Sequence, residues 1–337
     1  MTGSAERPRV VVSVPPGLRD AFFTVETWRR LDAAADLTVL DAHTDRAALA
    51  AALPEARALI TSWGTPRIEA ELLTRAPDLE LVAHTGSAVA PYVSEEVFRR
   101  GVRVTQAGDE MARPVAEVAL TFTLALLHRT HRFDHALRTG ASWESAGEAP
   151  PRHEIHGSAI GVIGASRTGR AYITLAQALG AQVSVTDPYL SPSDADRLGV
   201  QLLPLDELLS SSRIVAVHAP ATAETRHLLD AGRLALLPDG AGLVNTARSW
   251  LVDESALAAE LRTGRIDAAV DVFDAEPLPV GHPFRALPNV LLTPHTAAGT
   301  VECRHRLGAS AVTEIVRLLD GLPPLTAVGP EALARLH

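Results

Sequence analysis

Short apolar runs alternate with helical stretches along most of this 337-residue chain, and this alternation limits the fold more than any other feature. Strands that alternate with helices form parallel βα units, because a parallel connection needs a crossover. A helix at 115–127 that is apolar nearly all round, and a polar stretch with Gly and Pro at 139–157, separate two such series. The sequence therefore predicts an α/β fold with two Rossmann-like domains of unequal size. The expected strands are residues 8–14, 37–40, 58–61, 79–83, 102–105, 158–163, 182–186, 213–217, 241–245, 267–271 and 289–293.

Further helices have recognisable sequence signals. The helix expected at 253–263 has Asp253 as its N-cap and stops at Gly264. A final amphipathic helix is expected at 301–320.

Composition narrows the class of protein. A hydrophobic content of 47% with 21% charged residues is typical of an ordinary globular protein. The net charge of -9, without any basic run, argues against a nucleic-acid partner. Lysine is absent, so all 31 basic side chains are arginine. This absence excludes Schiff-base catalysis and a Walker A phosphate loop, because both need a lysine amine.

The sequence also indicates a compartment. The single cysteine, Cys303, allows no intrachain disulfide and suits a reducing environment. Residues 1–9 are polar, unlike a secretory signal, and no apolar run reaches the roughly 18 residues that a membrane span needs. We expect a cytoplasmic enzyme that binds no membrane.

A Gly-rich turn follows the strand at 158–163 and precedes a helix expected at 170–179. Its first glycine permits a tight turn and its last permits close helix–strand packing, while the helix N-terminus offers N–H groups to a pyrophosphate. Serine replaces the usual middle glycine; its Cβ crowds the backbone approach, although its hydroxyl can donate to a phosphate. A purely structural turn is the alternative. The candidate cofactor-binding residues here are Gly164, Ser166, Arg167, Thr168 and Gly169.

An acidic residue, Asp187, ends the next expected strand, about twenty residues after Gly164, where an acid can bind the hydroxyls of an adenosine ribose. The same carboxylate repels a 2′-phosphate, and no basic residue follows directly. NAD is therefore favoured over NADP. The alternative is a turn or N-capping Asp before Pro188.

Three side chains with complementary chemistry each follow an expected strand: Arg248, Glu276 and His295. An arginine binds a carboxylate through two parallel hydrogen bonds. A histidine held by a carboxylate can transfer a proton near neutral pH. Taken singly, each has a simpler explanation: a phosphate contact or surface charge for the arginine, a turn residue for the glutamate, and a surface or packing residue for the histidine.

The ordered set resembles the NAD-dependent D-2-hydroxyacid dehydrogenase family. Matching stretches are His218-Ala219-Pro220 with Thr225, Gly242 to Arg248, Leu251 to Glu254, Asp271-Val272-Phe273 and Thr293-Pro294-His295. The resemblance implies a nucleotide-binding domain, residues 108–304, inserted into a flavodoxin-like substrate domain of residues 1–107 and 305–337. It also implies a homodimer formed through the nucleotide-binding domain.

The resemblance also implies roles for single residues. Arg248 is expected to bind the substrate carboxylate, Glu276 to support His295, and His295 to be the general acid or base. Asp271 is expected to contact the nicotinamide carboxamide. The other cofactor-binding residues implied are His218, Ala219, Pro220, Thr225, Thr246 and Ala247.

Some positions depart from the family pattern. Ser249 and Trp250 follow Arg248 where a small glycine is common, and the loop from His84 to Val89 lacks an Asp often found just after it. Gly86 and Ser87 in this loop can still offer N–H groups to a carboxylate. Trp63 is expected either to shape the substrate pocket or to pack in the core.

The function expected is hydride transfer between NAD(H) and a 2-oxoacid, without a metal. The alternatives are an NAD-sensing binding protein and a dehydrogenase of a non-carboxylate anion.

Overall fold

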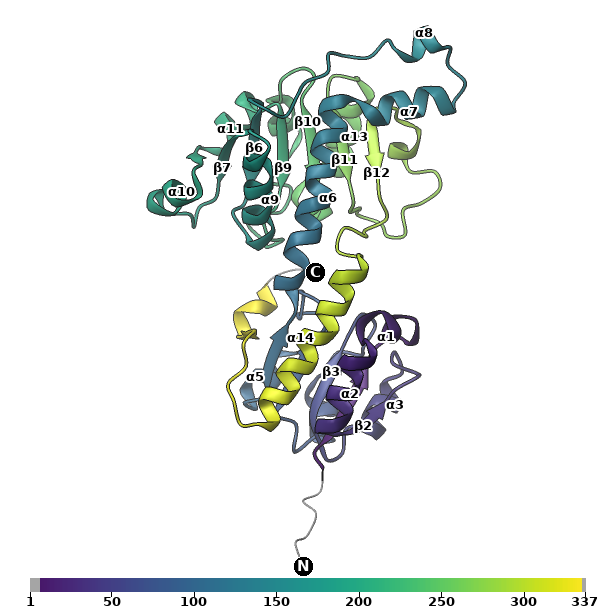
Figure 1. Ribbon diagram of the computed structural model, residues 1–337, viewed down its shortest axis with the longest axis vertical. Coiled ribbons are helices and arrows are strands. Elements are labelled where there is room, and N and C mark those ends of the chain that lie inside the picture. Colours follow the sequence, from purple (N-terminus) through teal and green to yellow (C-terminus); the bar gives the residue numbers. More distant parts are fainter. Residues whose placement is uncertain (1–6, 335–337) are drawn as a thin grey trace, which may run out of the picture. The chain divides into compact units, whose positions relative to one another are not determined.

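The computed structural model describes residues 7–334 and divides into two compact units (Figure 1). Unit 1 joins the part of the chain up to Met111 with the part from Gly299 onward, and unit 2 spans Ala112–Ala298. The boundaries expected from the sequence, after residues 107 and 304, lie near these divisions. Of the polar N-terminal stretch at 1–9, residues 1–6 lie outside the described part.

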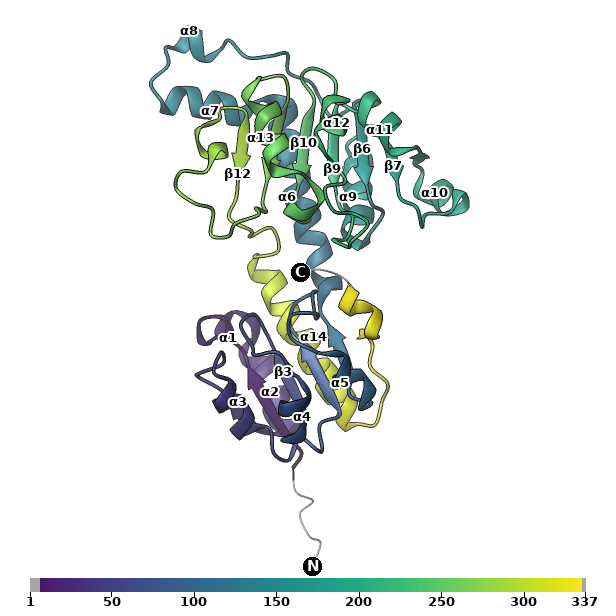
Figure 2. The same ribbon diagram turned by 180° about the vertical axis from the view of Figure 1, so that it is seen from behind.

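Unit 1 is built on a sheet with the strand order β13-β5-β4-β3-β1-β2. The order reverses between β1 and β3, and β13 alone pairs antiparallel within the described residues. Helices α1, α2 and α14 cover one face in Figure 1, and α3, α4 and α5 the other in Figure 2. The elements are β1 (Arg9–Ser13), α1 (Pro16–Phe22), α2 (Val25–Ala34), β2 (Asp36–Val39), α3 (Arg46–Ala52), β3 (Ala56–Thr61), α4 (Ala70–Thr74), β4 (Leu81–His84), α5 (Glu95–Arg99), β5 (Arg103–Gln106), α14 (Val301–Leu319), β13 (Ala327–Val328) and the 3-10 helix η3 (Pro330–Ala334).

Unit 2 contains a sheet in the order β12-β11-β10-β9-β6-β7-β8, in which all the pairs are parallel. Helices α6 and α9 cover one face (Figure 1), whereas α12 and α13 cover the other (Figure 2). Its elements, starting with the helix that enters from unit 1, are α6 (Gly108–His128), α7 (Thr130–Arg138), α8 (Trp143–Ala146), β6 (Ala159–Ile163), α9 (Arg167–Ala178), β7 (Gln182–Thr186), α10 (Pro192–Leu198), β8 (Gln201–Leu202), α11 (Leu205–Ser211), β9 (Ile214–Val217), α12 (Ala231–Ala235), β10 (Gly242–Asn245), η1 (Ser249–Leu251), α13 (Glu254–Arg262), β11 (Asp267–Val270), η2 (Pro283–Ala286) and β12 (Val290–Leu292).

The expected α/β class and the two Rossmann-like domains are confirmed, and the expected strands are present with ends that differ by at most two residues. The expected N-cap at Asp253 is also confirmed, since its carboxylate accepts from Ala256 N at 2.9 Å. Two short strands, β8 and β13, were not predicted. Strand β8 is exposed along its length, so no apolar run marks it.

Helix α9 begins at Arg167, earlier than the expected start at residue 170. Ser166 is its N-cap and accepts from Gly169 N at 3.2 Å. The residue that breaks the glycine pattern therefore starts the helix, because a capping hydroxyl satisfies an N–H group that the first turn leaves free.

Candidate active site

The Gly-rich turn of unit 2 follows β6, where the strand order reverses between β6 and β9. Gly164 has φ +96°, and a Cβ on it would lie 2.6 Å from Ala219 N. A Cβ on Gly169 would lie 2.1 Å from the Gly164 carbonyl oxygen. Glycine is therefore required at both positions. The turn brings the N-terminus of α9 to the carboxyl edge of the sheet, which is where dinucleotides bind in this kind of fold.

Asp187 lies against this turn. One carboxylate oxygen accepts from Ala165 N at 2.7 Å and the other from Tyr189 N at 2.8 Å. The alternative proposed from the sequence, a turn Asp, thus describes part of what this residue does. An ionised carboxylate has roughly four acceptor positions, so hydroxyls of a ribose can bind it as well.

The loops after β9 and β10 complete this edge. Thr246 is buried, and its hydroxyl has no hydrogen-bond partner among the residues that the structure describes. Thr225 accepts from Thr222 N at 2.8 Å and donates to the Pro220 carbonyl at 2.7 Å, which shapes the loop. A buried hydroxyl without a partner and a turn that only glycine can form both fit a bound dinucleotide.

The side chain of His218 packs in the interior of unit 2, and its contact with a cofactor stays a prediction. Its ring is buried against Tyr172, with 5.0 Å between ring centroids, and within the described residues neither ring nitrogen has a hydrogen-bond partner. Burial lowers the pKa of His218 to about 3. The imidazole is therefore neutral near pH 7 and packs beneath the turn.

Glu276 and His295 form a hydrogen-bonded pair, with His295 Nδ1 lying 2.7 Å from Glu276 Oε2. The other oxygen of Glu276 accepts from Phe273 N at 2.9 Å, so both ends of the carboxylate are fixed. A carboxylate at Nδ1 favours the tautomer with the proton on that nitrogen, which leaves Nε2 for proton exchange.

The backbone at His295 is unusual. Its φ of +52° is in the left-handed region that few residues other than glycine adopt. The buried Asp271 carboxylate holds this conformation, since it accepts from Thr296 N at 2.9 Å and from Ala297 N at 3.0 Å, and also from the Thr293 hydroxyl. Asp271 therefore fixes the loop that carries the histidine, a role that the sequence did not indicate. Its contact with a nicotinamide stays a prediction.

Arg248 is half-buried on the loop after β10 and donates to the carbonyl of Ala247 at 2.6 Å. Burial lowers the pKa of Arg248 below its ordinary value, and the charge of Glu276 opposes that shift. The guanidinium remains charged near neutral pH. Arginine, glutamate and histidine thus come from three loops at one edge of the unit 2 sheet.

A cavity of about 680 Å³ adjoins the histidine–glutamate pair. Its volume is within the range of small-molecule sites. Apart from Glu276, Arg285, Thr293 and His295, its lining is apolar: Phe273, Pro277, Leu278, Leu292 and Pro294.

The remaining predicted substrate residues belong to unit 1. Trp63 follows β3, beside the strand reversal of that sheet, and 41% of its surface is exposed, so it is not simply a core residue. A Cβ on Gly86 would lie 2.7 Å from His84 Nε2 and 3.3 Å from the Trp63 ring, so a larger residue there would have to displace the buried His84 side chain. The neighbouring Ser87 is exposed. Burial lowers the pKa of His84 to about 3, so this imidazole is no proton donor near pH 7.

Within residues 7–334, no three His, Cys, Asp or Glu side chains gather as metal ligands would. None of the helices described there combines the length and the apolar character needed to cross a bilayer.

Comparison with known proteins identifies the relatives of this chain. Residues 120–297 match the family model described as "D-isomer specific 2-hydroxyacid dehydrogenase, NAD binding domain". A D-3-phosphoglycerate dehydrogenase from Mycobacterium tuberculosis is 39% identical over 81% of this chain and 51% of its own length. The chain thus spans about half the length of the phosphoglycerate dehydrogenases that it matches. A glyoxylate reductase from Aeropyrum pernix is 32% identical over 97% of this chain and 98% of its own length.

Solved structures similar to this chain include dehydrogenases of the same kind. A 2-hydroxyacid dehydrogenase from Ketogulonicigenium vulgare has a TM-score of 0.81 at 29% identity and covers 96% of this chain and 99% of its own. The holo form of D-mandelate dehydrogenase from Rhodotorula graminis has a TM-score of 0.84 at 25% identity and covers 96% and 98% of the two chains.

Proposed function

This chain belongs to the D-isomer specific 2-hydroxyacid dehydrogenase family, and on that premise we propose that it transfers a hydride between NAD(H) and a 2-oxoacid or D-2-hydroxyacid. NAD is the cofactor of the family's nucleotide-binding domain. The observation that carries the proposal is the hydrogen bond of 2.7 Å between His295 Nδ1 and Glu276 Oε2, because a histidine oriented in this way is built to transfer a proton.

Each residue of the trio has a separate task in this reaction. When bound, NADH supplies a hydride to the carbonyl carbon of a 2-oxoacid. Arg248 binds the substrate carboxylate and polarises the carbonyl. His295 donates a proton from Nε2 to the carbonyl oxygen, and in the reverse direction it removes a proton from the hydroxyl. Glu276 holds the ring in the orientation that this transfer needs.

For the cofactor, we propose that the pyrophosphate contacts the N-terminus of α9 and that Asp187 binds the adenosine ribose. Asp271 is proposed to contact the nicotinamide carboxamide from the end of β11. The unpartnered hydroxyl of Thr246 supports a contact at the same edge. The other proposed cofactor-binding residues are Gly164, Ser166, Arg167, Thr168, Gly169, His218, Ala219, Pro220, Thr225 and Ala247.

Three further residues are proposed to bind the substrate: Gly86 and Ser87 through their N–H groups, and Trp63 through its indole. We also propose a cytoplasmic homodimer formed through the NAD-binding domain. Light scattering on the purified protein measures the mass in solution and so tests whether a dimer forms.

The proposed function is tested by NADH oxidation with glyoxylate, hydroxypyruvate, pyruvate and bulky phenyl or branched 2-oxoacids. Turnover of at least one 2-oxoacid is expected. Tight NADH binding without any turnover would instead favour an NAD-sensing protein, which needs no proton donor. Turnover restricted to an anion without a carboxylate would favour the other alternative, a dehydrogenase of a non-carboxylate anion, in which Arg248 binds a different group.

Replacing Asp187 with Ala is expected to raise the Kd for NADH by about 10–100-fold, since a hydrogen bond to a charged group contributes roughly 1.5–3 kcal/mol. The Kd for NADPH should change less, because the carboxylate that repels a 2′-phosphate is also lost. Fluorescence titration measures both constants. Asp187→Asn is the matched control, since its amide oxygen can still accept from Ala165 N. An equal loss of affinity for both nucleotides would show that Asp187 only shapes the turn.

A further inference from the structure

A second histidine–glutamate pair lies close to the first. His282 Nε2 is 3.0 Å from Glu254 Oε1, and both side chains are mostly buried, with 11% and 20% of their surfaces exposed. The His282 ring contacts the rings of Phe273 and Phe284 edge-on, with centroids 6.2 and 4.8 Å from its own. The segment between β11 and β12 carries both His282 and Glu276.

The proton on His282 can be assigned from its contacts. Nδ1 accepts from Phe284 N at 3.3 Å, so this nitrogen carries no proton. Nε2 therefore carries the proton and donates it to Glu254. The neutral His282 ring thus connects Glu254, to which it donates, with η2, for which His282 is the N-cap.

The second oxygen of Glu254 binds the same segment at another point, where it accepts from Asp274 N at 3.1 Å. Asp274 precedes Glu276 and His282 follows it. One carboxylate therefore ties down the segment on both sides of Glu276. Arg285 adds bonds within the segment, to the carbonyls of Leu278 at 2.8 Å and Pro279 at 2.9 Å.

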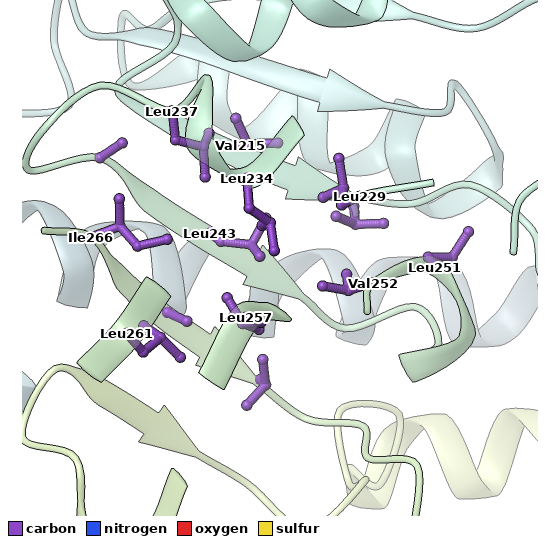
Figure 3. Close-up of a cluster of buried hydrophobic side chains, with 14 of the residues drawn as sticks. Val215, Leu229, Leu234, Leu237, Leu243, Leu251, Val252, Leu257, Leu261 and Ile266 are labelled. Atoms are coloured by element: carbon purple, nitrogen blue, oxygen red, sulfur yellow. The ribbon is translucent and has the colours of Figure 1, made fainter. Parts of the chain in front are cut away.

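Glu254 itself is attached to a rigid part of unit 2. It is the first residue of α13, whose N-cap Asp253 bonds to Ala256 N. Leu257 and Leu261 of this helix are buried in the hydrophobic core on that face of the sheet (Figure 3). The segment that binds Glu254 is therefore held in place by a helix that packs in the core, and not only by contacts within its own loop.

We propose that Glu254, through His282 and the Asp274 N–H, is a positioning residue that holds Glu276 in the place where it orients His295. This inference rests on the proposed function. It follows because the carboxylate of Glu276 makes short bonds to Phe273 N and His295, so a small displacement of its segment breaks one of them.

The test compares Glu254→Ala and Glu254→Gln with the wild type. We expect Glu254→Ala to lower kcat by about 10–100-fold, because misplacement by about 1 Å has effects of that size. The Kd for NADH should remain unchanged. The kcat of Glu254→Gln should be intermediate, since a single amide oxygen can accept only one of the two hydrogen bonds. Glu254→Gln also retains the side-chain volume, so it keeps the test valid if the alanine variant folds poorly. Glu207→Ala, an exposed acid in the first turn of α11, is the matched control and should change nothing.

A second readout needs no turnover. Imidazole ¹⁵N NMR should show the His295 ring in the Nδ1–H tautomer in the wild type and in a mixture of tautomers in Glu254→Ala, with the signal identified by its absence in a His295 variant. If the wild type turns over a 2-oxoacid while Glu254→Ala keeps both kcat and the tautomer, the positioning role is wrong. If the wild type turns over no 2-oxoacid, the proposed function fails instead.

Discussion

Replacing His295 with Gln is expected to lower kcat for 2-oxoacid reduction by about 10²–10⁴-fold, the range by which general acid–base catalysis accelerates reactions. Glutamine can still bond to Glu276, but it cannot donate a proton to a developing alkoxide at neutral pH. The Kd for NADH should remain close to that of the wild type, because the cofactor contacts proposed above lie on other loops. Steady-state NADH oxidation and fluorescence titration measure the two quantities.

The matched control is His128→Gln, which changes an exposed histidine at the end of α6. It should leave both quantities unchanged. Neither His84 nor His218 is expected to replace His295, since burial lowers the pKa of each to about 3 and keeps both rings neutral. Full activity in His295→Gln would contradict the mechanism, whatever the substrate.

The placement of Arg248, Glu276 and His295 at one edge of the unit 2 sheet could be predicted from the sequence, because each residue follows a strand of that sheet. In a parallel sheet the carboxyl ends of the strands meet at one edge, so the order of elements alone brings such side chains near one another. Their chemistry then suggested a carboxylate substrate and a proton transfer. The distance of 2.7 Å between His295 Nδ1 and Glu276 Oε2 in the structure adds the geometry that the sequence pattern lacks.

The supporting contacts could not be predicted in this way. Asp271 binds the backbone of the 293–297 segment, and Glu254 binds Asp274 and His282. These bonds depend on the path of irregular loops, and loops have neither the period of a strand nor that of a helix to mark them. The left-handed backbone at His295 is likewise invisible in sequence, because a preceding proline does not indicate it.

The family does not determine the substrate. The relatives named above are a phosphoglycerate dehydrogenase, a glyoxylate reductase and a mandelate dehydrogenase. The acids in these three names differ in size and charge. If Arg248 binds the carboxylate, as proposed above, it binds a group that all these acids share, so it does not by itself select among them.

At the other end of the unit 2 strands, a buried ion cluster holds the junction of α6 and α7. Asp267, the first residue of β11, is 1% exposed. It accepts from Arg129 Nη1 at 2.6 Å and from Arg132 Nε at 3.0 Å, and His131 Nε2 lies 3.1 Å away. Arg129 also donates to the Gly240 carbonyl at 2.7 Å. A carboxylate that neutralises two arginines, one of them fully buried, cannot be removed without leaving charge unpaired.

Replacing Asp267 with Asn is therefore expected to lower the free energy of unfolding by about 3–5 kcal/mol, the cost typical of breaking a buried ion pair. Urea denaturation followed by circular dichroism measures it. Asp134→Asn is the control, since Asp134 pairs with Arg138 at 2.8 Å on the exposed face of α7 and should contribute less than about 1 kcal/mol. Equal effects of the two substitutions would contradict this role for Asp267.

From the same cluster we predict how the difference in unfolding free energy between the wild type and Asp267→Asn depends on pH. Burial raises the pKa of Asp267, but the bonds from His131 and Arg132 and the charges of Arg129 and Arg132 outweigh it, and the pKa falls from 3.8 to about 2. Since the folded state binds this proton less tightly than the unfolded state, the ionised carboxylate stabilises the fold fully above about pH 4, and this contribution is lost as the pH falls towards 2. The gap in unfolding free energy between the two proteins should thus be constant from pH 7 to pH 5 and narrow below pH 4. A gap that widens on acidification would mean that Asp267 is not held as a carboxylate.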